Sequence, residues 1–233
     1  MALARFKDLC IDVNDSRRMT VFWSAALGLT PRTSDQARGA DGSPVLLRGP
    51  TPQHGVWINT VPEPRTVKQR VHIDVHGASV AEQETLGARV LPGWGPFSWT
   101  VMADPEGGEY CLFEREHVPG YRLYELSVDS LNPEPIAAWW AGVFDATITR
   151  DSDGEPAVSD IPGAPFGSFV FGQVAEPKRA KNRIHWDVLV DDAGAIETLA
   201  RKGAAMVRQQ DDDIDWTVMA DPDGNEFCVF VDG

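Results

Sequence analysis

The chain has 233 residues, of which 42% are apolar and 24% charged, a globular composition that excludes extensive disorder. Its 35 acidic residues outnumber 21 basic ones, and a net charge of −14 disfavours nucleic acid as a partner. No run reaches the roughly 18 apolar residues of a membrane span, and the first residues lack the pattern of a secretory signal, so we expect neither membrane insertion nor secretion.

The first predicted elements are a strand and a helix. Apolar and polar residues alternate over residues 8–13, which is the period of a half-buried strand. Asn14 or Asp15 is placed to cap a helix that runs to about Leu27, and Gly28 follows where a left-handed residue ends many helices. Further strands are predicted around residues 45–47, 56–61 and 71–75, a second helix over 79–88, and a final hairpin of residues 99–102 and 110–113.

The same order of elements recurs in the second half because the sequence is a tandem repeat. Residues 99–111, WTVMADPEGGEYC, return as residues 216–228, WTVMADPDGNEFC, with ten of thirteen positions identical. Residues 70–75, RVHIDV, likewise return as residues 183–188, RIHWDV. The sequence therefore predicts two similar domains, residues 1–117 and 118–233, each with two strand–helix–strands units.

The three cysteines, Cys10, Cys111 and Cys228, are odd in number and far apart, which excludes a disulfide scaffold and a zinc ribbon. Free thiols are typical of reducing compartments, so a cytoplasmic location is predicted. Cys111 and Cys228 are interpreted first as small buried fillers of the core.

Paired units with these motifs resemble the vicinal oxygen chelate superfamily, which includes glyoxalase I, extradiol dioxygenases and bleomycin-resistance proteins. The resemblance rests on Phe22-Trp23 ahead of Leu27-Gly28, on the histidine-bearing strands and on the Asp-Pro turns before the last strands. Residues 181–187, KNRIHWD, are similar to a glyoxalase-like branch common in actinobacteria. The resemblance implies an α+β fold of two tandem glyoxalase-like domains, each a pair of βαβββ units forming a cupped half-barrel sheet. It does not determine the chemistry, because this fold supports several reactions and also passive binding.

The resemblance also implies where a metal would bind, since enzymes of this superfamily hold one divalent ion in the cup. Carried over one position at a time, the ligand positions fall on Asp8, His72 and Cys111 in the first copy, and on His185, Cys228 and, one pleat further along, Glu125 in the second. One histidine and one cysteine per cup is a poor set for ions that prefer carboxylate and imidazole. We therefore expect no cofactor, with a divalent metal as the alternative.

The histidine-bearing strands carry a polar stripe. Residues two apart share one face of a strand, so the arginine, histidine and aspartate of each copy point one way and their apolar neighbours pack on the helices. The polar face is expected to line the concave side of the sheet. The candidate ligand-binding residues are Arg70, His72, Asp74, Arg183, His185, Asp187, Cys111 and Cys228. The other interpretation is that an Arg–Asp ion pair only braces the cup.

Two functions from different classes follow. One is metal-independent binding of a small molecule, for which the negative charge favours a cationic or amphipathic ligand and Trp57, Trp94 and Trp99 are candidates to line the pocket. The alternative is a metal-dependent lyase, isomerase or dioxygenase that uses His72 or His185. The missing glutamate ligand favours binding, and the histidine retained in both copies favours the enzyme. The expected partner is a small-molecule ligand, and homodimerisation is left open.

Overall fold

The computed structural model describes residues 1–32, 43–93 and 97–232. They form four successive βαβββ units. Unit 1 contains β1 (Arg5–Val13), α1 (Ser16–Leu27), β2 (Thr30–Pro31), β3 (Val45–Arg48), the short 3₁₀ helix η2 (Pro52–His54) and β4 (Val56–Thr60). Unit 2 contains β5 (Val71–Gly77), α3 (Val80–Thr85), β6 (Arg89–Val90), β7 (Thr100–Ala103) and β8 (Glu109–Glu114).

Units 3 and 4 repeat this order. Unit 3 contains β9 (Leu123–Ser130), α4 (Pro133–Phe144), β10 (Thr147–Arg150), β11 (Pro156–Ser159) and β12 (Ser168–Gln173). Unit 4 contains β13 (Ile184–Val190), α5 (Gly194–Arg201), β14 (Ala205–Arg208), β15 (Thr217–Ala220) and β16 (Glu226–Val231). The predicted α+β class and the paired βαβββ units are confirmed.

Helix α1 shows how the local sequence determines an element. Its N-cap is Asp15, whose side chain accepts a hydrogen bond from the backbone N–H of Arg18, and it ends at Gly28 in the left-handed conformation with φ 67°. The Asp-Pro turn of unit 2 adds a second cap, because the Glu106 carboxylate accepts the backbone N–H groups of Asn14 and Asp15. The turn motif thus joins the two units of the first repeat.

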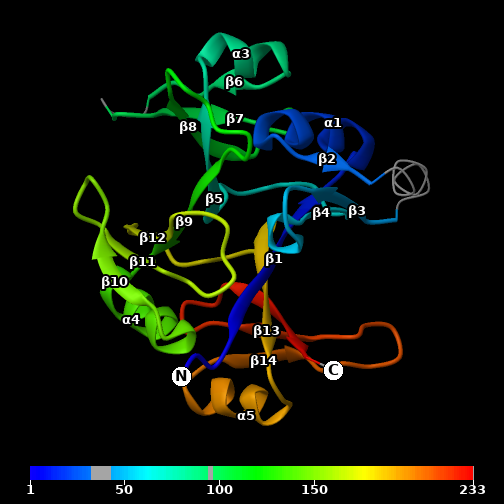
Figure 1. Cartoon of the computed structure of the whole chain (residues 1–233), viewed down its shortest axis with the longest axis vertical. Coiled ribbons are helices and arrows are strands. Elements are labelled where there is room, and N and C mark those ends of the chain that lie inside the picture. The colour runs from blue at the N-terminus through cyan, green and yellow to red at the C-terminus, as the bar shows by residue number, and fades with distance from the viewer. Residues whose placement is uncertain (33–42, 94–96, 233) are drawn as a thin grey trace.

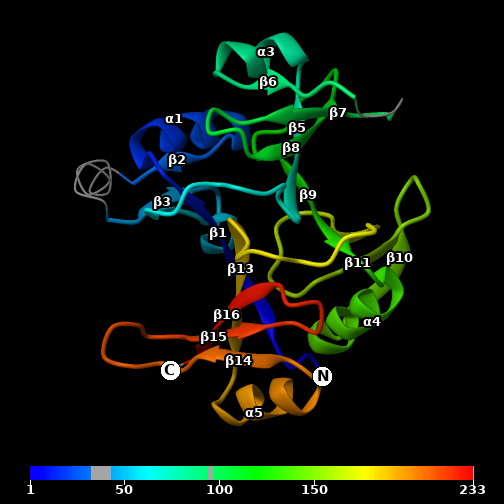
Figure 2. The same cartoon turned by 180° about the vertical axis from the view of Figure 1, so that it is seen from behind.

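The strands form two eight-stranded mixed sheets. Sheet A has the order β14-β15-β16-β13-β1-β4-β3-β2, and sheet B has the order β10-β11-β12-β9-β5-β8-β7-β6. In each unit the first and last strands are parallel neighbours, and the units meet through the antiparallel pairs β1–β13 and β5–β9. Figures 1 and 2 show the blue strand β1 beside β13, and the green strands of units 2 and 3 together in the other sheet.

Each sheet therefore combines one unit from each repeat. Unit 1 pairs with unit 4 in sheet A, and unit 2 pairs with unit 3 in sheet B. The chain is thus divided in two different ways. The repeats meet near residue 117, whereas each sheet takes one unit from each repeat. This decides which candidate residues can meet, because side chains share a cup only when their strands belong to one sheet.

The helices hold the two units of each repeat together. Trp23 of α1 packs edge-on against Tyr110 of β8 at 5.7 Å between ring centroids, so the helix of unit 1 covers a strand of unit 2. Trp140 of α4 lies 5.2 Å from Trp186 and 5.1 Å from Phe227 in unit 4. Strand pairing across repeats and helix packing within repeats therefore interlock the sheets. No helix in the described segments is long and apolar enough to cross a membrane.

Candidate functional site

The arginines of the polar stripe do not enter the cups. Arg70 donates to the backbone oxygens of Glu176 and Asp129, and Arg183 donates to the backbone oxygen of Glu63. Both line a cleft of about 820 Å³ between the sheets, walled by the crossover segments 61–70 and 174–183. The expected Arg–Asp brace does not form between these arginines and the aspartates of their own strands. Each arginine precedes the first residue of its strand, so strand alternation does not fix its direction.

The two sheets regroup the remaining candidate residues. Asp8 lies opposite Asp187, and Cys228 lies beside Asp187 on the next strand, so all three belong to sheet A. In sheet B, Glu125 and Cys111 lie on either side of Asp74. Asp8 therefore meets the His185 strand and Glu125 meets the His72 strand, each across the repeat boundary.

Sheet B encloses a cavity of about 570 Å³. Its polar wall includes His72, Asp74, Cys111, Glu125, Ser127 and Ser168, and the basic residues Lys68 and Arg150 also line it. The Ser127 hydroxyl donates to Asp74 Oδ2 at 2.7 Å, and the Ser168 hydroxyl donates to Glu125 Oε1 at 2.6 Å. Throughout the described segments, neither carboxylate forms an ion pair with a lysine or arginine.

An aromatic wall lines another part of this cavity and consists of Phe97, Trp99, Phe113 and Tyr124. Trp99 stacks between Phe97 and Phe113, at 4.6 Å and 5.5 Å between ring centroids. Tyr124 packs edge-on against Phe113 at 5.2 Å. Of the tryptophans expected to line a pocket, Trp99 does so, Trp57 belongs to sheet A, where its ring N–H points to Asp8, and Trp94 lies outside the described residues.

Burial controls the ionisation of the polar wall. It raises the pKa of Asp74 to about 7, an effect that the Ser127 hydrogen bond opposes and the charge of Glu125 reinforces. Burial also raises the pKa of Glu125 and lowers that of His72. The pKa of the Cys111 thiol rises well above its usual range, through burial first and then the charge of Asp74, so this thiol is a weak nucleophile near neutral pH.

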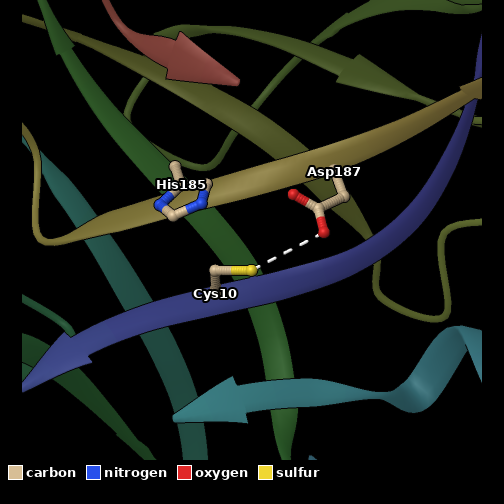
Figure 3. Close-up of side chains that lie close together, drawn as sticks. All are labelled: Cys10, His185 and Asp187. Atoms are coloured by element: carbon tan, nitrogen blue, oxygen red, sulfur yellow. Dashed lines mark hydrogen bonds between the residues drawn. The ribbon is translucent and has the colours of Figure 1, made fainter. Parts of the chain in front are cut away.

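Sheet A has a different polar cluster at the corresponding positions (Figure 3). Cys10 on β1 faces His185 and Asp187 on β13, and its thiol donates to Asp187 Oδ2 at 3.6 Å. The three residues offer ligand atoms that all lie within 4.8 Å of one another. Burial first, and the adjacent Asp8 second, raises the pKa of Asp187 well above its usual range.

A divalent metal, which the resemblance implies for a cup of this fold, fits the donors of sheet A and not those of sheet B. Cysteine sulfur, imidazole nitrogen and carboxylate oxygen are all zinc ligands, and the ring atom Nδ1 of His185 is buried without a hydrogen-bond partner in the described structure. Over the same described ranges, sheet B brings no such group of donors together.

Sequence reasoning missed Cys10 and Asp187 as metal donors because it followed the superfamily's positions along each repeat. The alternation of Asp8, Cys10 and Asp12 on one strand face was the available signal.

Comparisons with known proteins agree with this fold. The sequence profile of a family described as "Glyoxalase-like domain" matches residues 8–113 and again residues 125–230. No curated protein sequence matches the chain.

Solved structures extend the likeness over the full length. Glyoxalase I from Zea mays superposes with a TM-score of 0.70 at 13% identity, covering 97% of this chain and 92% of the maize chain. A protein from Bacillus subtilis, titled as a dioxygenase on provisional grounds, gives a TM-score of 0.65 at 12% identity, covering 99% of this chain and 86% of its own. At such low identity these similarities establish the fold alone.

Proposed function

Because this chain belongs to the glyoxalase-like domain family, we propose that it binds a small amphipathic cation in the cavity of sheet B, without a catalytic metal there. The observation that carries the proposal is that Asp74 and Glu125 accept hydrogen bonds from the hydroxyl groups of Ser127 and Ser168 and form no ion pair with a lysine or arginine in the described structure. Two carboxylates in one cavity repel each other, and a ligand ammonium group relieves this repulsion. Acidic residues outnumber the basic Lys68 and Arg150 in the lining of this cavity, so its charge disfavours small anions.

The aromatic wall supplies the apolar half of the site. Trp99, Phe113 and Tyr124 line the cavity, and the body of an organic cation gains from burial against such aromatic surfaces. A volume of about 570 Å³ is in the usual range for a small-molecule site. The ligand class is therefore an amine or quaternary ammonium with an aromatic or aliphatic body.

Passive binding is favoured over covalent chemistry in this cavity. Cys111 is the thiol of the polar wall, and its raised pKa leaves it protonated. His72 stands 4.0 Å from Asp129, at the limit of ion-pair distance, and burial lowers its pKa. The alternative, a metal-dependent reaction, belongs to sheet A, where the donor cluster lies.

Calorimetric titration with three probes of similar shape tests the proposal. The probes are benzyltrimethylammonium, its neutral carbon isostere neopentylbenzene, and the anion phenylmethanesulfonate. We expect binding of the ammonium probe only, weakened about tenfold by Glu125→Gln, the equivalent of about 1.4 kcal/mol.

Asp8→Asn provides the matched control, because Asp8 occupies in sheet A the position that Glu125 occupies in sheet B. This variant is expected to bind the ammonium probe as the unaltered protein does. Equal binding of the neutral isostere, or an unchanged affinity in Glu125→Gln, would refute the proposal.

A further inference from the structure

We propose that sheet A binds one thiophilic divalent cation of the zinc class between Cys10, His185 and Asp187, at a site separate from the cavity of sheet B. The proposal is independent of the organic-cation site, since its residues lie on β1 and β13 and none of them lines that cavity. It names a ligand set centred on Cys10 and Asp187, where the superfamily's positions fall on Asp8 and Cys228.

The geometry is close to that of a tetrahedral site. Two ligands of a tetrahedral zinc ion, at ordinary bond lengths, stand about 3.5 Å apart. Cys10 Sγ and Asp187 Oδ2 are already 3.6 Å apart, and all three donor atoms lie within 4.8 Å of one another. Figure 3 shows Cys10 reaching from β1 toward the two side chains of β13. Side-chain adjustment of about 1 Å is enough to bring the three donors onto one ion.

The burial of these donors is the second observation. His185 is 8% exposed and Asp187 is 3% exposed. The ring atom Nδ1 of His185 and the Oδ1 atoms of Asp187 and Asp8 are buried without a hydrogen-bond partner in the described structure. Buried polar atoms are normally satisfied, so three such atoms on two adjacent strands point to an absent partner. A cation satisfies several of them at once, which no single hydrogen bond can do.

Charge balance favours a divalent ion. The nearby lysines pair with other carboxylates, Lys7 with Asp8 and Lys181 with Asp12, and no lysine or arginine among the described residues pairs with Asp187. On binding, the ion bonds to the sulfur, the imidazole nitrogen and a carboxylate oxygen, and the thiol and carboxyl protons leave to solvent. The two positive charges of the ion then balance the thiolate and the carboxylate, so the site remains neutral.

Sheet B provides an internal comparison. His72 and Asp74 correspond to His185 and Asp187, but Ser127 takes the place of Cys10 and donates to Asp74 at 2.7 Å. A hydroxyl is a poor ligand for a thiophilic ion. The exchange of one sulfur for one oxygen therefore assigns the metal to sheet A.

Titration with Co²⁺, a spectroscopic substitute for zinc, tests the site in the full chain after treatment with a chelator. We expect one equivalent to bind and to produce the near-ultraviolet absorption of a cobalt–thiolate bond. Cys10→Ser should abolish this absorption, and His185→Asn should weaken Co²⁺ binding at least tenfold. The matched variants Cys111→Ser and His72→Asn, which alter sheet B, should leave both signals unchanged.

X-ray absorption at the zinc edge of the unaltered protein needs no variant and remains decisive if Cys10→Ser does not fold. We expect one equivalent of zinc with at least one sulfur ligand beside nitrogen or oxygen ligands. A shell without sulfur, a thiolate absorption that persists in Cys10→Ser, or failure to bind one equivalent of either ion would overturn the proposal.

Discussion

Asp74 is buried between β8 and β9, and its ionisation sets the charge that a ligand meets in the sheet B cavity. The groups that face it are Ser127 and Glu125 on β9, Cys111 on β8 and, at longer range, Asp151 after β10. Burial is the dominant influence and raises the pKa of Asp74 to about 7. At pH 6 the carboxyl group is therefore mainly neutral, and at pH 8 it is mainly ionised.

Affinity for benzyltrimethylammonium is expected to rise between pH 6 and pH 8. A cation stabilises the ionised carboxylate, so binding releases a proton below pH 7 and is strongest where Asp74 is already charged. Asp74→Asn should flatten the profile and lower the affinity at pH 8 about tenfold. Calorimetry across this pH range measures both effects. An affinity that falls with pH, or a slope that survives in Asp74→Asn, would contradict this assignment.

The same carboxyl group should make the fold less stable as pH rises. Its folded pKa of about 7 lies above the usual value of 3.8, so the folded state holds the extra proton between these limits. The contribution of this carboxyl group to the free energy of unfolding is then largest below about pH 4 and declines up to about pH 7. Denaturant unfolding at pH 5 and pH 8 gives the free energy of unfolding of Asp74→Asn and of the unaltered protein. The difference between the two proteins isolates this contribution. A difference that is the same at both values of pH would count against a raised pKa.

Individual site residues were predictable from the sequence where strand alternation applied. His72 and Asp74 follow apolar neighbours on β5, and both line the cavity, as the stripe indicated. Arg70 and Arg183 lie one residue before their strands, outside the pattern, and their side chains reach the crossover segments. Ligand roles for these residues stay predictions until binding is measured.

Helix α1 ends against the segment that enters β9, and a glycine makes this contact feasible. Gly28 has φ 67°, and a β-carbon placed on it would lie 1.9 Å from the backbone oxygen of Gly120. The backbone N–H of Arg122 donates to the oxygen of Leu27 at 3.0 Å beside it. The end of the first helix is thereby attached to the link between the two repeats.

Gly28→Ala should lower the free energy of unfolding by about 2–3 kcal/mol, because it adds both strain and a backbone clash. Gly142→Ala is the matched control. Gly142 is exposed within α4 and has open space around it, so alanine should stabilise the helix by about 0.5–1 kcal/mol. Denaturant unfolding of the two variants should shift the midpoint in opposite directions. A neutral Gly28→Ala would mean that the close approach to Gly120 is absent.

Most elements could be predicted from the sequence, but their pairing could not. The period of apolar residues indicated β1 and β5, the repeat indicated β9 and β13, and Asp15 and Gly28 indicated the ends of α1. The two histidine strands, β5 and β13, have nearly the same sequence, so nothing local tells β1 which of them to join. Residues 61–70 and 174–183 carry the chain from one sheet to the other, so the partner of each strand lies far away in the sequence.

The interlocking of the sheets predicts that neither repeat is stable as a monomer. A fragment of residues 1–117 keeps β1 and β5 but loses their partners β13 and β9, which leaves two long unpaired strand edges. We expect this fragment to dimerise or aggregate, and to form a 1:1 complex when refolded with residues 118–233. Light scattering after size-exclusion chromatography measures both states. A monomeric first fragment with cooperative unfolding would show that a repeat closes a sheet alone.

The molecule as described has two cups of common origin with different chemistry. Sheet B combines paired hydroxyl–carboxylate groups with an aromatic wall, and sheet A brings together a thiol, an imidazole and a carboxylate. Duplication supplied the same strand positions twice, and the residues at those positions then diverged. These differences support the proposed division of roles between an organic-cation site in sheet B and a metal site in sheet A.

A crystal structure of the protein soaked with benzyltrimethylammonium tests this division most directly. We predict the probe in the cavity of sheet B, with its ammonium group beside Asp74 and Glu125 and its ring against Trp99 or Tyr124. Density for the probe in sheet A or in the cleft between the sheets, with the sheet B cavity free of it at saturating concentration, would contradict the proposed function.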